Sequence, residues 1–173
     1  NPISTLGTTY PNLHMASVYG SRVFGVDSNL VYASAYNDYA NWDLDTADNT
    51  SSAPAWVSMS QSNVKADGEF TGIYTYDNHV VLFKKDFMQL VYNNKNPFRI
   101  VDVGAYGADN PYAIAEANGV LYFASSDGVY AFGGGTPKLV STSLGLQNFT
   151  GAVLGGYKDT LYAQIGNTLY RLR

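Results

Sequence analysis

The chain has 173 residues, a net charge of −4, 46% hydrophobic residues and 14% charged residues. This hydrophobic content excludes a disordered chain, and the absence of a basic stripe gives no electrostatic support for nucleic-acid binding. The chain has no cysteine, which excludes a disulfide scaffold and thiol chemistry, and no apolar run reaches the ~20 residues of a membrane-spanning helix. Fifteen tyrosines, eight phenylalanines and seventeen glycines favour β structure with frequent turns.

Four segments of the chain share one hairpin pattern, which is a turn pair, a strand, a short turn and a second strand. They are GSRVFGVDSNLVY (20–32), NHVVLFKKDFMQL (78–90), NGVLYFASSDGVY (118–130) and KDTLYAQIGNTLY (158–170). This alignment makes Phe24, Leu82, Tyr122 and Tyr162 equivalent, at intervals of 58, 40 and 40 residues. A second equivalent set follows eight residues later: Tyr32, Leu90, Tyr130 and Tyr170.

A further strand is expected before three of these hairpins, at 70–76, 111–117 and 149–155. Three or four strands every ~40 residues is the period of a β-propeller blade. In the hairpin at 117–135, apolar side chains fall on both alternating faces, as expected for strands that are covered on both sides. An ordinary β-sandwich with similar hairpins is the alternative.

We therefore predict an all-β chain with a β-propeller-like repeat of antiparallel blades. One domain at 1–173 would hold about four units, near 13–36, 70–94, 111–135 and 149–173, so the propeller would be partial. The chain begins at Asn1 rather than methionine and ends at Arg173 in or just after a strand, so we expect it to be part of a longer protein.

A polar insertion loop is predicted at 37–69, between the first two units, because this segment is rich in Asn, Asp, Ser and Thr. It contains both tryptophans, Trp42 and Trp56, which we expect to anchor the loop on the blades; stacking on a ligand is the alternative. The acidic run DLDTADN (43–49) lacks the spacing and the final glutamate of a calcium loop, so we interpret it as a solvated loop.

No motif for catalysis or metal binding is present. His14 and His79, the only histidines, stand apart beside expected strands, and a structural or surface role is expected for each. SSDGVYAF begins like an Asp-box but lacks its tryptophan, so Asp127–Gly128 is interpreted as a turn in which glycine supplies a positive φ. We expect no enzyme activity, no cofactor and no metal; an enzyme on a β scaffold would need a carboxylate pair that the sequence does not mark.

Exposed loops are the remaining candidates for function, because loops on a rigid scaffold carry binding residues. The charged turn KKD (84–86) is expected to keep a hairpin tip solvated and to discourage edge pairing. The candidate interaction residues are Trp42, Asp43, Trp56, Lys84, Lys85 and Asp127.

With these residues in view, the chain resembles the β-propeller proteins of the neck or tail of tailed-bacteriophage virions. The resemblance lies in the order of three motifs: a hairpin followed by Trp-Asp, then Phe-Lys-Lys, then Asp-Gly-Val-Tyr. They occur in RVFGVDSNLVYASAYNDYANWD (22–43), GIYTYDNHVVLFKKDFMQLVY (72–92) and the segment 119–134, and the likeness extends over about 13–137.

The resemblance implies a non-enzymatic structural component of the virion, located in the neck or tail, with no catalytic residues. It also implies partners among other virion proteins, a homo-oligomeric ring, and contact with the host surface. A carbohydrate- or surface-binding propeller module of a bacterial protein is the alternative.

Overall fold

The computed structural model describes residues 10–42, 55–57, 68–92 and 98–172, which form four antiparallel sheets and almost no helix. The expectation of an all-β chain is therefore confirmed. Sheet 1 contains β1 (Met15–Tyr19), β2 (Arg22–Asp27), β3 (Leu30–Ala33) and β4 (Trp56–Val57), and sheet 2 contains β5 (Gly72–Tyr76), β6 (His79–Lys84), β7 (Phe87–Tyr92) and β8 (Arg99–Gly104). Sheet 3 contains β9 (Ile114–Ala117), β10 (Val120–Ser125), β11 (Gly128–Phe132) and β12 (Lys138–Leu139), and sheet 4 contains β13 (Val153–Tyr157), β14 (Thr160–Ile165) and β15 (Thr168–Leu172). Two short 3-10 turns, η2 (Pro111–Ala113) and η3 (Thr142–Leu144), lie in the connections.

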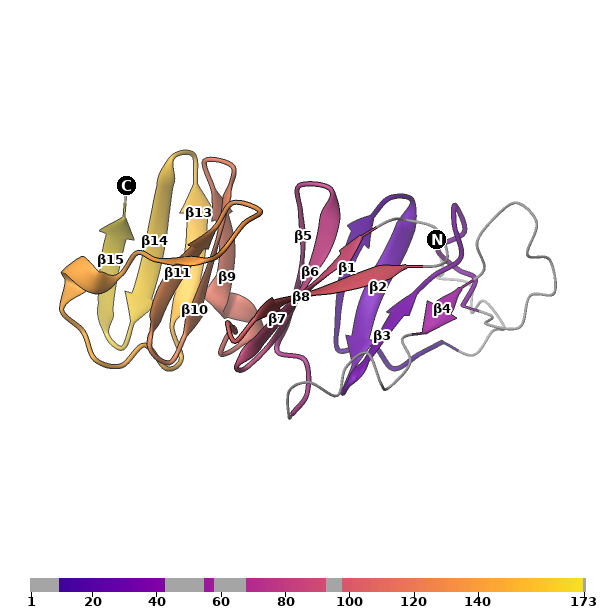
Figure 1. Cartoon of the computed structure of the whole chain (residues 1–173), viewed down its shortest axis with the longest axis horizontal. Coiled ribbons are helices and arrows are strands. Elements are labelled where there is room, and N and C mark those ends of the chain that lie inside the picture. The colour runs from indigo at the N-terminus through magenta and orange to yellow at the C-terminus, as the bar shows by residue number, and fades with distance from the viewer. Residues whose placement is uncertain (1–9, 43–54, 58–67, 93–97, 173) are drawn as a thin grey trace, which may run out of the picture.

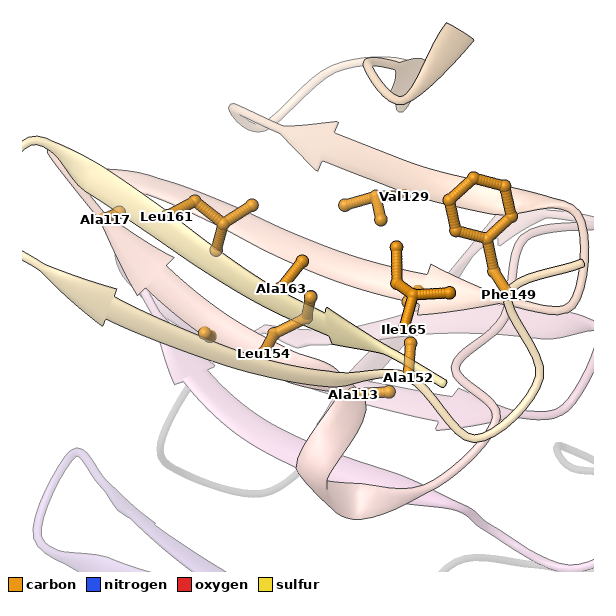
Figure 2. Close-up of a cluster of buried hydrophobic side chains, with 11 residues drawn as sticks. Ala113, Ala117, Val129, Phe149, Ala152, Leu154, Leu161, Ala163 and Ile165 are labelled. Atoms are coloured by element: carbon orange, nitrogen blue, oxygen red, sulfur yellow. The ribbon is translucent and has the colours of Figure 1, made fainter. Parts of the chain in front are cut away.

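The four sheets stack face to face in chain order, with sheet 1 and sheet 4 at opposite ends (Figure 1). We call the packed layer between two sheets a junction. Junction 1–2 buries Phe24, Val26, Val80 and Leu82, and junction 2–3 buries Val81, Phe83, Leu121 and Phe123. Junction 3–4 buries Val129, Phe149, Leu154, Leu161 and Ile165, as Figure 2 shows. Across the described residues the stack is open and does not close into a ring or barrel.

Sheets 2 and 3 are covered on both faces, because each lies between two neighbours. All six residues of β6 are buried, and β10 is buried or half-buried throughout. A strand with one wet face would alternate buried and exposed positions. The apolar character of both faces of the 117–135 hairpin therefore follows from its place inside the stack.

The alignment of the second unit is corrected by one residue. β2, β6, β10 and β14 begin at Arg22, His79, Val120 and Thr160, so the intervals are 57, 41 and 40 residues. The residue equivalent to Phe24, Tyr122 and Tyr162 is therefore Val81, and the one equivalent to Tyr32, Tyr130 and Tyr170 is Gln89.

This one-residue slip changes the face on which a side chain lies. Val81 packs into junction 2–3, whereas Leu82, the residue chosen from the sequence, packs into junction 1–2. Because β6 is apolar on both sides, hydrophobicity does not mark the register of this strand. The turns do: Asp77 and Asn118, which precede β6 and β10, have φ values of 52° and 50°.

The first strands of neighbouring sheets approach closely, and glycine makes this possible. A Cβ on Gly72 would lie 2.2 Å from Ile114 Cδ1, and a Cβ on Gly156 would lie 1.7 Å from the backbone oxygen of Glu116. Between β1 and β5, the hydroxyls of Ser17 and Thr75 lie 2.6 Å apart. Convergence of first strands is what a fan of propeller blades requires, although the described sheets do not complete such a fan.

The insertion contributes to sheet 1 as well as to a loop, since β4 (Trp56–Val57) pairs with β3. Trp42 is only 9% exposed, which agrees with an anchoring role rather than an open stacking surface. Asp43, the side chain of Trp56 and the acidic run 43–49 lie outside the described residues.

The close contact at Gly156 yields a test of the stack. Replacing Gly156 with alanine should destabilise the protein by about 2 kcal/mol or more, because the added Cβ meets the backbone of β9 and cannot be relieved by a rotamer change. The matched control is Gly155→Ala in the same strand, where a Cβ meets nothing within 4 Å. Urea unfolding of both variants gives the comparison, and equal effects would contradict close packing of β9 on β13.

His79 is a buried histidine among aromatic rings and predicts acid sensitivity. It is 4% exposed, and burial lowers its pKa while Asp77 acts in the opposite direction. Below its ordinary pKa of about 6.5 the unfolded chain binds a proton that the folded chain does not, so stability falls as pH decreases. The melting temperature of the wild type should fall as the pH is lowered from 7.5 to 5.5. The fall should be smaller in His79→Phe, whereas the control His14→Gln, at an exposed position, should behave like the wild type.

Candidate functional site

The β-turns between the second and third strands of the sheets lie at one end of the stack, which we call the turn end. These turns are Ser28–Asn29 in sheet 1, Lys85–Asp86 in sheet 2 and Ser126–Asp127 in sheet 3. Each is a two-residue connection, so residues at the same turn position are structurally equivalent. Asn29, Asp86 and Asp127 form one such set.

At junction 1–2 the turn end is filled by Lys84, which corrects its expected place at a solvated tip. Lys84 is 2% exposed, and its Nζ donates a hydrogen bond to Asn29 Oδ1 at 2.8 Å. The ammonium also lies 5.3 Å from the centroid of the Phe70 ring. Lys84 ends β6 on the face toward sheet 1, so its stem packs in the junction and its charge has an amide and an aromatic partner.

Phenylalanine closes two of the three junctions at this end. The backbone N–H of Phe70 donates to Ser28 O at 2.9 Å, and that of Phe149 donates to Ser126 O at 3.0 Å. Both side chains are buried, at 7% and 2% exposure. Each ring therefore fills the space beneath the turn of the preceding sheet.

Junction 2–3 has Ala108 at the corresponding position. Its N–H donates to Lys84 O at 3.1 Å, one residue before the turn of the preceding sheet. The residues that follow Phe70 and Ala108 also make equivalent bonds, each to the fifth residue of the second strand of the next sheet. The N–H of Thr71 donates to Phe83 O in β6 at 2.8 Å, and the N–H of Asp109 donates to Ala124 O in β10 at 3.0 Å. Alanine therefore stands where the other junctions have phenylalanine, and it lacks the ring that closes them.

A polar pocket of about 250 Å³ opens at the turn end of junction 2–3. Sheet 2 and the connection after β8 form one wall, and the end of the β10–β11 hairpin forms the other. Its lining residues are Lys85, Asp86, Ala105, Tyr106, Gly107, Ser125, Ser126, Asp127 and Tyr130.

Asp127 is held as a carboxylate within this pocket. Its oxygens accept hydrogen bonds from Ser125 Oγ and from Tyr130 Oη, the latter at 2.7 Å. The bond from Ser125 is the largest cause of a lowered Asp127 pKa, and Tyr130 adds to it. Burial, followed by this bond to Asp127, raises the pKa of Tyr130 to about 12.

The tyrosine rings give the pocket an aromatic side. Tyr106 and Tyr130 meet edge to face, with centroids 5.7 Å apart. The Tyr130 ring also stacks on Phe123 at 5.4 Å, which fixes it to the core. The pocket thus combines carboxylates, hydroxyls and a fixed aromatic surface, a set suited to binding.

Gly128 is needed for close packing and not for its backbone angle, which corrects the interpretation from the sequence. Its φ is not in the positive range. A Cβ there would lie 2.3 Å from Leu139 Cδ1 and 2.9 Å from Ser141 Oγ. The connection after β11 folds back over this position, and a larger residue would have to displace the Leu139 and Ser141 side chains.

Of the candidate interaction residues, Lys85 and Asp127 come together in the pocket. Lys84 lies in the neighbouring junction, and Trp42 lies buried in the connection after β3. Sequence analysis missed Tyr106 and Ala108, although one signal was available: Phe-Thr-Gly occurs at 70–72 and 149–151, while the linker between them has Ala108–Asp109 instead.

Within the described ranges no three His, Asp or Glu side chains gather to hold a metal ion. The same part of the chain contains no helix long and apolar enough to cross a bilayer.

No protein-family model matches this chain, and no curated protein sequence matches it. The resemblance to phage propeller proteins therefore stays a prediction.

Tyr130→Phe tests the hydrogen bonding of Asp127. Loss of one donor should raise the Asp127 pKa toward its ordinary value, which carboxyl-carbon NMR measures. A depressed carboxyl pKa stabilises the fold above the unfolded value of about 4 and ceases to do so as pH falls through the folded value. The stability difference between wild type and Tyr130→Phe should therefore shrink below pH 4, while Tyr112→Phe, at an exposed position, should change neither quantity.

Proposed function

We propose that this protein is a non-enzymatic structural component of a bacteriophage virion, acting in the neck or tail through a propeller-like repeat. The virion assignment rests on the resemblance carried by segments 22–43, 72–92 and 119–134. The assembly role rests on the outer face of sheet 4, which in the described residues repeats part of the pattern of the faces that bind neighbouring sheets.

The outer face of sheet 4 carries this proposal. Toward sheet 4, sheet 3 presents Ala115, Tyr122 and Val129. The equivalent outward residues of sheet 4 are Gly155, Tyr162 and Leu169, so small, aromatic and aliphatic residues recur in these three places. The same face of sheet 4 also carries Gln164 and Arg171, where sheet 3 has Ala124 and Ala131. Leu169 is 67% exposed, an unusual placement for leucine in a strand that continues such a pattern.

A hydrogen bond that recurs between sheets also points to a further sheet against this face. Tyr19, at the end of β1, donates from its hydroxyl to Asn78 O of sheet 2 at 2.5 Å. Tyr76, at the end of β5, donates to Gly119 O of sheet 3 at 2.7 Å. The equivalent residue of sheet 4 is Tyr157, which ends β13 and is 64% exposed. Tyr157 is therefore placed to bond the turn of a further sheet.

The occupant that fits this face best is sheet 1 of a second copy of the chain. Every junction joins the face of one sheet that points to the next sheet in the chain (its forward face) to the opposite, backward face of that next sheet. In the described residues no earlier sheet lies against the backward face of sheet 1. That face presents Val18, which is 61% exposed, with half-buried Val23 and Tyr32. Leu13 packs over Gly25 on the same face and adds to its apolar surface.

Head-to-tail contacts of this kind generate a ring when the rotation closes. We therefore propose a homo-oligomeric ring in the virion, in which loops of the turn end remain available to other virion proteins or to the host surface.

Leu169→Glu tests the assembly. The wild-type mass from light scattering should rise above that of one chain as concentration increases, whereas Leu169→Glu should remain monomeric because it buries a charge in place of an aliphatic contact. Tyr112→Glu, at a 71% exposed position on η2, should assemble like wild type. A wild type that stays monomeric at every concentration, or a Leu169→Glu variant that assembles equally well, would contradict the proposed interface.

The virion assignment has its own test. Mass spectrometry of purified particles should detect peptides of this chain at a fixed ratio to the neck or tail proteins. Peptides found in host-cell fractions but absent from particles would remove the virion assignment and leave the assembly result unaffected.

A further inference from the structure

We propose that the pocket at junction 2–3 binds a primary alkylammonium group supplied from outside the chain. This inference concerns a ligand and does not depend on the assembly role. It is drawn from the neighbouring junction, where the same structural position is occupied by an ammonium of the protein itself.

Junction 1–2 shows how the turn end holds an ammonium. Lys84 Nζ lies 2.8 Å from the side-chain oxygen of Asn29 in the preceding turn. It also lies 5.3 Å from the ring centroid of Phe70 in the linker between the sheets. The site thus includes an oxygen acceptor and an aromatic ring, and the lysine stem packs in the junction.

Junction 2–3 has an oxygen acceptor at the position equivalent to Asn29 but no lysine at the position equivalent to Lys84. The residue equivalent to Asn29 is Asp86, whose carboxylate is a stronger acceptor for a cation than an amide oxygen. The residue equivalent to Lys84 is Ser125, whose short side chain bonds Asp127 in its own hairpin and does not cross the junction. The position of the ammonium is therefore left to a ligand.

The linker between sheets 2 and 3 also differs from the other two linkers, and the space for a ligand lies along it. Ala108 stands where the other linkers have phenylalanine and is itself fully buried. The pocket of about 250 Å³ is lined by the residues just before it, Ala105, Tyr106 and Gly107. Tyr106, two residues earlier in the linker, lines the pocket and supplies an aromatic face near the lost ring. Junction 3–4 shows the opposite solution, since Ile165 and Phe149 occupy the two positions there and both are buried.

The charges of the pocket favour a cation. Asp86 and Asp127 carry two negative charges, and Lys85, which is exposed, carries one positive charge. The hydrogen bonds from Ser125 and Tyr130 keep Asp127 ionised, and a carboxylate has further lone pairs with which to accept from an ammonium. The tyrosine faces add a cation–π attraction that a neutral ligand would not gain.

The binding experiment uses the full chain and n-butylammonium chloride as the probe. Amide NMR shifts at Ser126 and Asp127 are followed during titration, with sodium chloride at equal ionic strength as the reference. We expect saturable shifts with n-butylammonium and none with n-butanol. Nα-acetyl-lysine amide and 1,5-diaminopentane are then compared, and the tighter of the two distinguishes a protein lysine from a free amine as the source.

Two variants separate this site from other sites. Ser125→Lys supplies the ammonium from within the chain, as Lys84 does, and should abolish the shifts while raising the melting temperature. Asp86→Asn, at an exposed turn position, should weaken binding about fivefold because a charged acceptor becomes neutral. Asp159→Asn, in sheet 4 outside the pocket, is the matched control and should bind like wild type.

Several outcomes would overturn the proposal. These are absence of saturable shifts with n-butylammonium, equal shifts with n-butanol or with methyl glucoside, unchanged affinity in Asp86→Asn, and full binding by a folded Ser125→Lys. Equal shifts with methyl glucoside would instead identify a neutral sugar site. Should Ser125→Lys fail to fold, Asp86→Asn alone still decides the question.

Discussion

Burial of both faces of the middle sheets is the constraint on which the rest of this structure depends. β6 has no exposed residue, so sheet 2 is stable only between two other sheets, and sheet 3 is in the same position. Apolar area removed from water on both sides stabilises the stack, but it also removes the alternation that would fix strand register. Register must then come from the turns and from close approaches of the strands, as where Gly156 meets the backbone of Glu116.

The same constraint explains why the turn end varies between junctions. The centre of each junction needs apolar side chains, but the hairpin ends lie at the margin, where different fillings are tolerated. Lysine with phenylalanine, isoleucine with phenylalanine, and serine with alanine occupy equivalent places in the three junctions. Beside the last combination a pocket opens among the described residues, between the β10–β11 hairpin on one side and the β6–β7 turn with the connection after β8 on the other.

The sequence predicts the strands and their antiparallel pairing well, because glycine- and asparagine-containing turns and apolar runs specify hairpins locally. It misplaces the second unit by one residue, since Leu82 and Val81 are equally apolar and pattern alone does not choose between them. The pocket depends on relations between segments far apart in the chain, such as Ala108 beneath the turn at Lys85–Asp86. Lys84 is missed for a similar reason: its charge suggests solvent, and only the position of Asn29 in another sheet shows why it is buried.

The two proposed contacts use different parts of the stack and need not compete. Assembly would involve the broad outer faces of sheets 1 and 4, which lie at the two ends (Figure 1). The pocket lies at an edge of the stack, between two internal sheets, where adding a sheet to either end leaves the lining residues uncovered. A ring of such chains would therefore present one pocket per copy along the turn end, so an array of amines on a partner surface would gain from simultaneous binding that a single amine does not have.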